Sequence, residues 1–317
     1  MSTFIRDFIE REKINRRNFL LASAMGAGSL MLPGSLRRAV AADGTAMAWS
    51  YRDRASAYWN AIVSGGEAYV ESLGLNKSAM TSLINEGSSE KSLSDIKAFL
   101  AKNNGNCAIA CDPNDSPNAR PVVEATKAAG GYISTIWNKA DDLHPWDFGD
   151  NYVSHMSWSG VQPSKEAAIK LIEAMGGKGA IVHVGGIPAN IPAIERLEGL
   201  KQALAEYPDV QLLDVQSADW DTAKAASLMS SFITRYGDEI TGVHCANDNM
   251  AYGVLEALKA EGMTLPVTGF DGNPEAVKMV IDGELLATVF TNPFWGGGIS
   301  LALAHQAATG QKLGHVH

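Results

Sequence analysis

The polar and aromatic side chains that could do chemistry in this sequence are those suited to binding hydroxyl groups. The Asp271 carboxylate can accept two hydroxyl protons in charge-assisted hydrogen bonds, which are stronger than bonds between neutral groups. Asn138 and Asn247 each offer a donor and an acceptor in one side-chain amide. Tyr58 and Trp59 form an aromatic pair whose ring faces can lie against C–H groups. Together these residue types indicate a site for a small neutral molecule with many hydroxyl groups.

The sequence lacks the motifs that would indicate catalysis or a bound cofactor. Residues 185–190 (GGIPAN) follow a predicted strand, but they lack the third glycine of a dinucleotide-binding loop and include Pro188. There is no P-loop and no Gly-x-Ser-x-Gly motif. The seven histidines show no spacing typical of a metal site or a triad, and His183 and His244 fall inside predicted strands, where buried core imidazoles are expected. We therefore expect no enzyme activity, no cofactor and no metal, with an exported enzyme as the less favoured alternative.

The composition is that of an ordinary globular protein, with 46% hydrophobic and 19% charged residues among 317. The formal net charge is -9, and no stretch interleaves basic and aromatic residues, so we expect no nucleic-acid partner. Two of the three cysteines, Cys107 and Cys111, would point to the same face of one strand. Because no further Cys or His stands nearby at ligand spacing, we expect both to be small residues of the core.

Residues 1–42 have the pattern of an export signal. Arg16 and Arg17 begin the stretch RRNFL, an apolar run extends to Leu32, and residues 39–41 (AVA) have the small-x-small pattern that a signal peptidase requires. The RRxFL pattern resembles the twin-arginine export signal. The apolar run contains glycines and is too short to span a membrane. We predict a twin-arginine-type signal peptide over 1–42 and export to the periplasm; an ordinary secretory signal and a basic amphipathic helix are the alternatives.

From residue 45 onward, short β-rich runs alternate with amphipathic stretches of helical length. In residues 164–175, for example, apolar side chains recur at helical spacing and form one buried stripe. Strands separated by helices predict parallel sheets that are covered on both faces. Because the strands are too many for one such sheet, we predict an α/β protein with two doubly wound parallel-sheet lobes. The predicted strands are 45–51, 81–86, 107–111, 132–137, 152–157, 180–184, 211–215, 242–245, 266–270 and 287–290.

The candidate binding residues follow predicted strands, at the edge where open parallel sheets bind their ligands. Asn138, Asn247 and Asp271 come directly after the fourth strand, after the eighth strand and after the ninth strand. Residues 112–115 follow the third strand in the same way. Two carboxylates in these loops are expected to cap the helices that follow, namely Asp115 and Asp248.

The last third of the chain carries five ordered motifs that resemble those of a known family. They are ANDNMAYG (246–253), LPVTGFDG (265–272), NPEA (273–276), DGELLAT (282–288) and Asn292-Pro293. This set is similar to that of the ribose-type periplasmic sugar-binding proteins, the type I solute-binding proteins of ABC importers.

The resemblance implies the type I periplasmic binding protein fold, in which two lobes joined by a hinge close on a sugar. The implied division is 43–152 plus 292–317 for the N-terminal lobe and 153–291 for the C-terminal lobe. In the family, a further strand follows the segment that residues 310–317 match.

The resemblance also implies individual binding residues. Asn247 and Asp271 match polar ligand contacts of the second lobe, and Tyr58 and Trp59 match an aromatic pair that lies against the sugar ring. The full set of predicted ligand-binding residues is Tyr58, Trp59, Trp137, Asn138, Asn190, Asn247, Asp271 and Thr291.

Several positions depart from the family pattern. Trp137 and Asn138 stand where many relatives have an Asp-Arg pair, and Thr291 stands where glutamine is common at the hinge. We expect the arginine that usually follows the sixth strand to be missing, with Ile194 or a neighbour in its place and Asn190 as its substitute. The loss of these charged groups disfavours ribose and favours a neutral, rather apolar monosaccharide or polyol.

The expected function is that of the periplasmic solute-binding component of a sugar ABC importer. Its partners would be the sugar or polyol and the membrane permease of the ABC transporter, and we expect a monomer. The alternative is a periplasmic sensory receptor that presents its ligand-bound form to a chemoreceptor or histidine kinase.

Overall fold

The computed structural model describes residues 44–311 and 313, so the predicted signal peptide over 1–42 lies outside the described residues. The chain divides into two compact units. The first lobe comprises the described residues of Met1–Ser157 and Pro293–His317, and the second lobe is Trp158–Asn292. Among the described residues, no helix is both long enough and apolar enough to span a membrane.

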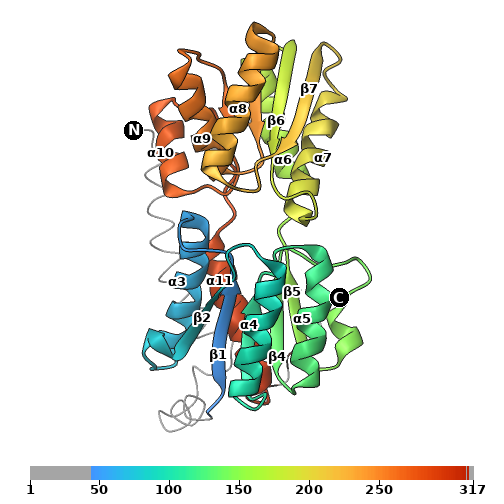
Figure 1. Ribbon diagram of the computed structural model, residues 1–317, viewed down its shortest axis with the longest axis vertical. Coiled ribbons are helices and arrows are strands. Elements are labelled where there is room, and N and C mark those ends of the chain that lie inside the picture. The colour runs from blue at the N-terminus through green and yellow to red at the C-terminus, as the bar shows by residue number, and fades with distance from the viewer. Residues whose placement is uncertain (1–43, 312, 314–317) are drawn as a thin grey trace. The chain divides into compact units, whose positions relative to one another are not determined.

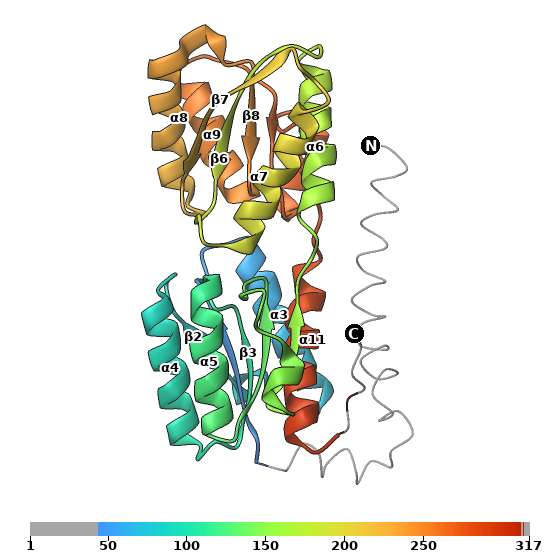
Figure 2. The ribbon, with the colours of Figure 1, turned by 90° about the vertical axis from the view of Figure 1, so that its right-hand side faces the viewer.

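The first lobe is built on a five-stranded parallel sheet (Figure 1). Helices α3 and α11 cover one face of this sheet, and α4 and α5 cover the other (Figure 2). The central strands are buried along their length and rich in small apolar residues, as strands covered on both faces must be. In sheet order the strands are β2 (Met80–Ile84), β1 (Ala46–Tyr51), β3 (Cys107–Cys111), β4 (Tyr132–Ile136) and β5 (Tyr152–Met156). The helices are α3 (Ala57–Ser72), η2 (Lys77–Ala79), α4 (Ser89–Lys102), α5 (Ser116–Ala128), η3 (Pro145–Phe148) and α11 (Pro293–Ala308).

The second lobe repeats this architecture with a four-stranded parallel sheet. Helices α6 and α7 lie on one face, and α8 and α9 lie on the other (Figure 2). In sheet order the strands are β7 (Val210–Ser217), β6 (Gly179–Gly185), β8 (Gly242–Cys245) and β9 (Val267–Thr268). The helices are α6 (Val161–Ala174), α7 (Ile191–Leu204), α8 (Thr222–Tyr236), η4 (Gly237–Glu239), α9 (Asp248–Ala260) and α10 (Pro274–Asp282).

The predicted fold class of two doubly wound parallel-sheet lobes is confirmed. Nine of the ten predicted strands form, and the prediction is wrong for the tenth. Residues 287–290 make only two isolated parallel bridges, Thr268 with Ala287 and Asp271 with Phe290. The ninth strand is also shorter than predicted, because the chain leaves the sheet after Thr268 and bends around the start of α9.

The lobe boundary falls later than the predicted position between residues 152 and 153. β5 pairs in parallel with β4 and completes the first sheet, so the whole strand lies in the first lobe. The chain therefore enters the second lobe at Trp158, and it returns to the first lobe at Pro293.

All three cysteines are buried and unpaired, as predicted for Cys107 and Cys111. Both of these pack in the core of the first lobe with Ile109 and Ile133, and Cys245 lies in the core of the second lobe. Burial raises the pKa of the Cys107 thiol to about 11, and it raises the pKa of Cys111 and Cys245 as well. The thiols therefore stay protonated and act as small apolar groups.

Glycines allow α3 and α11 to pack backbone against backbone in the first lobe. A Cβ atom added to Gly297 would lie 1.9 Å from the carbonyl oxygen of Ile62, and one added to Gly65 would lie 1.9 Å from the carbonyl oxygen of Phe294. The Trp49 indole donates to the Gly297 carbonyl at 3.0 Å and ties α11 to the sheet. This packing fixes the position of α3 against α11. The first turn of α3 carries the predicted aromatic pair, so the packing also fixes the position of that pair in the first lobe.

We predict that Gly297→Ala lowers the free energy of unfolding by about 1–3 kcal/mol, because the added methyl group forces the two helices apart. Urea unfolding followed by circular dichroism measures this change. Ser64→Ala, on the exposed side of α3, is the matched control and should change the free energy by less than about 0.5 kcal/mol. Equal stability of Gly297→Ala and the wild type would contradict this close packing.

Candidate functional site

Asp271 lies in the loop that follows β9 in the second lobe. Its side chain is buried, with 6% of its surface exposed, and its backbone has a positive φ of 120°, which non-glycine residues rarely adopt. The Asp271 amide donates to the carbonyl of Val289 at 2.8 Å. The carboxylate Oδ1 lies 3.3 Å from Nη1 of Arg196. A strained backbone conformation that points a carboxylate at a buried cation indicates a functional position.

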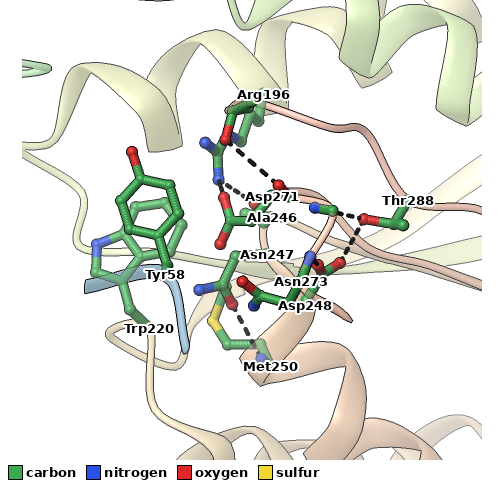
Figure 3. Close-up of polar contacts among 12 residues, drawn as sticks. Tyr58, Arg196, Trp220, Ala246, Asn247, Asp248, Met250, Asp271, Asn273 and Thr288 are labelled. Atoms are coloured by element: carbon green, nitrogen blue, oxygen red, sulfur yellow. Dashed lines mark hydrogen bonds and ion pairs between the residues drawn. The ribbon is translucent and has the colours of Figure 1, made fainter. Parts of the chain in front are cut away.

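Arg196 corrects the prediction that the arginine after the sixth strand is missing. The residue lies in the second turn of α7, is buried, and donates from Nη1 to the carbonyl of Ala246 at 2.6 Å (Figure 3). Because helical side chains lean toward the helix N-terminus, the long arginine side chain returns to the carboxyl edge of the sheet. Ile194, which we expected at this place, is 51% exposed.

Two aromatic rings accompany the Arg196 guanidinium. Its Cζ lies 3.8 Å from the centroid of the Phe270 ring and 5.5 Å from that of Trp220, distances suited to cation–π attraction. Burial raises the pKa of Asp271 to about 6, and the charge of Arg196 opposes this rise. Above about pH 6, the second lobe therefore holds a buried ion pair next to two aromatic faces.

Trp220 was missed by the sequence analysis, although it closely follows the seventh strand. Its indole Nε1 donates to Oδ1 of Asn190 at 2.5 Å. Gly186 makes room for the ring, since a Cβ atom there would lie 2.1 Å from it. The predicted binding residue Asn190 is thus buried and fixed to Trp220, at the start of α7.

Asn247 is the N-cap of α9. Its side-chain oxygen accepts from the Met250 amide at 2.9 Å (Figure 3), which leaves the amide NH₂ as the group it can present to a ligand. The prediction that Asp248 is this cap is wrong, because the Asp248 carboxylate turns into the protein toward Asn273 and Thr288. In the first lobe, Asp115 does cap α5 as predicted, accepting from the Asn118 amide at 2.8 Å.

Thr291 is buried at the end of the second lobe, beside Asp271. Its amide donates to the Asp271 carbonyl at 3.2 Å, and its hydroxyl lies 3.4 Å from the same oxygen. The second lobe therefore gathers Asp271, Thr291 and Arg196 in one network of direct contacts.

In the first lobe, the predicted aromatic residues form one cluster. The Trp137 indole donates to the Tyr58 hydroxyl at 2.7 Å, with the two ring centroids 6.4 Å apart. Trp59 meets Tyr58 edge to face at 5.2 Å. Tyr58 and Trp137 are buried, and Trp137 has a positive φ of 62°. The cluster joins the start of α3 to the end of β4, the carboxyl edge of the sheet.

Asn138 is also buried, and it contacts Asp112, which follows the third strand but was not in the predicted set of ligand-binding residues. Its side-chain amide donates to Oδ1 of Asp112 at 2.9 Å. Burial raises the pKa of Asp112 to about 6, and the hydrogen bond from Asn138 opposes the rise. The position of Asp112 directly after the third strand was the signal that could have identified it.

His183 and His244 are buried core imidazoles, as predicted. Their Nδ1 atoms lie 3.0 Å apart, His244 Nε2 lies 3.2 Å from the Ser164 hydroxyl, and that hydroxyl donates to the Arg196 carbonyl at 2.7 Å. Burial lowers the pKa of His183 well below its ordinary value and that of His244 to about 4. Within the described part of the chain, no group of three or more His, Cys, Asp or Glu side chains could hold a metal ion.

A family model described as periplasmic binding protein domain matches residues 47–312. The D-allose-binding periplasmic protein of Escherichia coli (strain K12) is 30% identical over 260 residues, 81% of this chain and 82% of the relative. A xylitol-binding protein of Mycolicibacterium smegmatis is 31% identical over 212 residues, 67% of this chain, and the match spans 59% of that relative's length.

The chain is also similar to proteins whose structures have been solved. A twin-arginine translocation pathway signal protein from Burkholderia phytofirmans is 48% identical, with a TM-score of 0.80 and coverage of 83% of this chain and 81% of that one. An ABC transporter periplasmic solute-binding protein from Actinobacillus succinogenes 130z with bound D-allose is 26% identical, with a TM-score of 0.74 and coverage of 84% and 93%.

We predict that the imidazole pair makes the fold sensitive to acid. Because the folded pKa of His244 is lowered to about 4, the unfolded chain binds more protons between pH 4 and 6.5, and stability falls as the pH decreases through this window. His244 alone should contribute a loss of about 2 kcal/mol between pH 8 and pH 5. The double variant His183→Asn/His244→Asn, unfolded in urea at both pH values, should lose less stability on acidification than the wild type. Parallel losses in the two proteins would contradict this account.

Proposed function

Because the chain belongs to the periplasmic binding protein family, we propose that it is the solute-binding component of an ABC importer for a neutral monosaccharide or polyol. The single observation that carries the proposal is the buried Arg196–Asp271 pair, which lies between strand ends and aromatic rings in the second lobe. Such a pair offers fixed donors and acceptors to hydroxyl groups without requiring a charged ligand.

The charges in this lobe favour a neutral ligand. Arg196 is compensated by Asp271, so no excess positive charge is left to hold a phosphate group. Trp220 and Phe270 add apolar ring faces of the kind that pack against the C–H groups of a sugar. The D-allose and xylitol bound by relatives have this mixture of hydroxyl groups and C–H faces.

The first lobe supplies a second, different set of groups. Asp112 is a buried carboxylate with Asn138 on one oxygen, and Tyr58, Trp59 and Trp137 present aromatic surface. We propose that the ligand also contacts these residues and therefore binds more tightly to the closed form than to the open form of the protein. The expected absence of an arginine after the sixth strand was one reason to disfavour ribose. Because Arg196 is present, that reason no longer holds.

Export and delivery complete the proposed function. The RRxFL pattern and the similarity to a twin-arginine translocation pathway signal protein support export of the chain to the periplasm. The closed form would then dock on the membrane permease of the transporter. The role is binding and delivery, without chemical conversion of the ligand.

We predict that one of D-ribose, D-allose, D-apiose, xylitol and myo-inositol stabilises residues 42–317 against heat. At 100 times its dissociation constant, a ligand adds about 2.7 kcal/mol, which raises the midpoint by about 5 °C in a chain of this size. Differential scanning fluorimetry measures the shift, with D-ribose 5-phosphate as a charged control. Asp271→Ala and Arg196→Met should both abolish it, because each leaves its partner buried and unpaired. A folded protein that none of the sugars stabilises would overturn the proposal.

We also predict that Asp112→Asn weakens binding of the stabilising sugar about tenfold at pH 7.5, since a neutral acceptor replaces a charged one. Because the pKa of Asp112 is raised to about 6, affinity in the wild type should fall as the pH decreases through 6, and this fall should be smaller in the variant. Isothermal titration calorimetry at pH 7.5 and 5 gives both numbers. Asp115→Asn, which lies three residues further along the chain and keeps the cap of α5, is the control for the dissociation constant at pH 7.5. An unchanged dissociation constant in Asp112→Asn would remove Asp112 from the site.

A further inference from the structure

Asp248 is a completely buried carboxylate next to residues 269–273, the loop that carries Asp271. We propose that Asp248 is a positioning residue, whose carboxylate holds residues 269–273 in the conformation that directs Asp271 toward Arg196 and the ligand. This inference rests on the proposed function for its effect on affinity, but its structural part can be tested without a ligand.

The loop is attached to Asp248 at Phe270 and Asn273 and, through Thr288, at Gly272. The Asp248 amide donates to the Phe270 carbonyl at 2.8 Å, and Oδ2 of Asp248 accepts from the Asn273 amide at 2.8 Å. Oδ1 accepts from the Thr288 hydroxyl at 2.6 Å, and the Thr288 oxygen in turn accepts from the Gly272 amide at 3.1 Å (Figure 3). Asp248 therefore binds the loop on both sides of Asp271, with its backbone amide at Phe270 and with its carboxylate at Asn273 and, through Thr288, at Gly272.

The loop conformation needs such a restraint. Asp271 has a φ of 120° and Gly272 has a φ of 70°, so two consecutive residues depart from the backbone region that most residues prefer. Gly269 lies so close that an added Cβ atom would be 2.3 Å from Oδ1 of Asp248. Strained backbone of this kind persists only where the surrounding contacts determine it.

The same contacts show that Asp248 acts through the loop and not on the ligand. Both of its oxygens already accept hydrogen bonds from the protein, and its side chain is closed to solvent. Burial and the neighbouring Asp271 raise its pKa well above the ordinary range, because both disfavour the ionised carboxylate unless hydrogen bonds compensate. The Thr288 hydroxyl and the Asn273 amide supply that compensation.

The decisive variants separate hydrogen-bond geometry from general stability. Asp248→Ala removes both attachments, Thr288→Val removes the link to Gly272, and Asp248→Asn keeps an acceptor for the Asn273 amide and a donor for Thr288. Asp221→Ala is the matched control, because it deletes an exposed helix cap of α8 in the same lobe without touching the loop. Isothermal titration calorimetry measures the dissociation constant of each variant, with the sugar or polyol that stabilises the wild type as the ligand.

We expect Asp248→Ala to raise the dissociation constant about tenfold, as it would if the aligned loop conformation fell to about one tenth of the population. Thr288→Val should weaken binding in the same direction, whereas Asp248→Asn and Asp221→Ala should stay within about threefold of the wild type. Recovery of affinity by the conservative Asn variant is the result that a purely stabilising role would not produce. Equal losses in Asp248→Ala and Asp221→Ala, or in Asp248→Ala and Asp248→Asn, would overturn the inference.

Hydrogen exchange of the ligand-free protein tests the inference independently of the sugar. In Asp248→Ala, the amides of residues 269–273 should exchange faster than in the wild type, while the peptide that contains Asn190 keeps its rate. This measurement decides the matter even if no sugar of the panel binds, which would refute the proposed function alone. Unchanged exchange in residues 269–273 would show that Asp248 does not hold the loop.

Discussion

The buried ion pair between Arg196 and Asp271 is the interaction on which the organisation of the second lobe depends. Removing two charges from water costs several kcal/mol for each ion, so the pair is tolerable only where geometry and additional hydrogen bonds compensate. The structure meets this requirement with the Ala246 carbonyl on Arg196 and with the Phe270 and Trp220 rings beside its guanidinium. Much of the lobe near the strand ends can be understood as support for these two side chains.

That support extends into groups that a ligand does not touch. The Ser164 hydroxyl joins the Arg196 backbone to His244 and through it to His183, while Asp248 restrains the loop that carries Asp271. Burial shifts the pKa values of the titratable groups in these networks in opposite directions. Burial raises the pKa of the carboxyl groups and lowers that of the imidazoles, and in each case it favours the neutral form.

The first lobe also has buried polar side chains at the ends of its strands, but fewer of them are charged. At the edge of its sheet, the Asn138 side chain donates a hydrogen bond to the Asp112 carboxylate. In its aromatic cluster, the Trp137 indole donates a hydrogen bond to the Tyr58 hydroxyl and holds it in place. The cluster stands on the first turn of α3, which the glycine contacts with α11 set in place. Rigid placement of aromatic rings in this way lowers the entropy that is lost when a ligand binds.

The sequence by itself determined the fold class, because the alternation of apolar strands and amphipathic helices needs only local periodicity to be read. It also located most of the polar residues at strand ends, including Asn247 and Asp271, since chain position and sheet edge coincide there. The approach of Arg196 to Asp271, the hydrogen bond between Asn138 and Asp112, and the inward turn of Asp248 were decided only by the tertiary structure. A long side chain can reach the site from the second turn of a helix, and the choice between capping a helix and binding a distant loop depends on neighbours that are remote in the sequence. Local sequence patterns do not show which residues that are remote in the sequence come into contact, because tertiary packing determines those contacts.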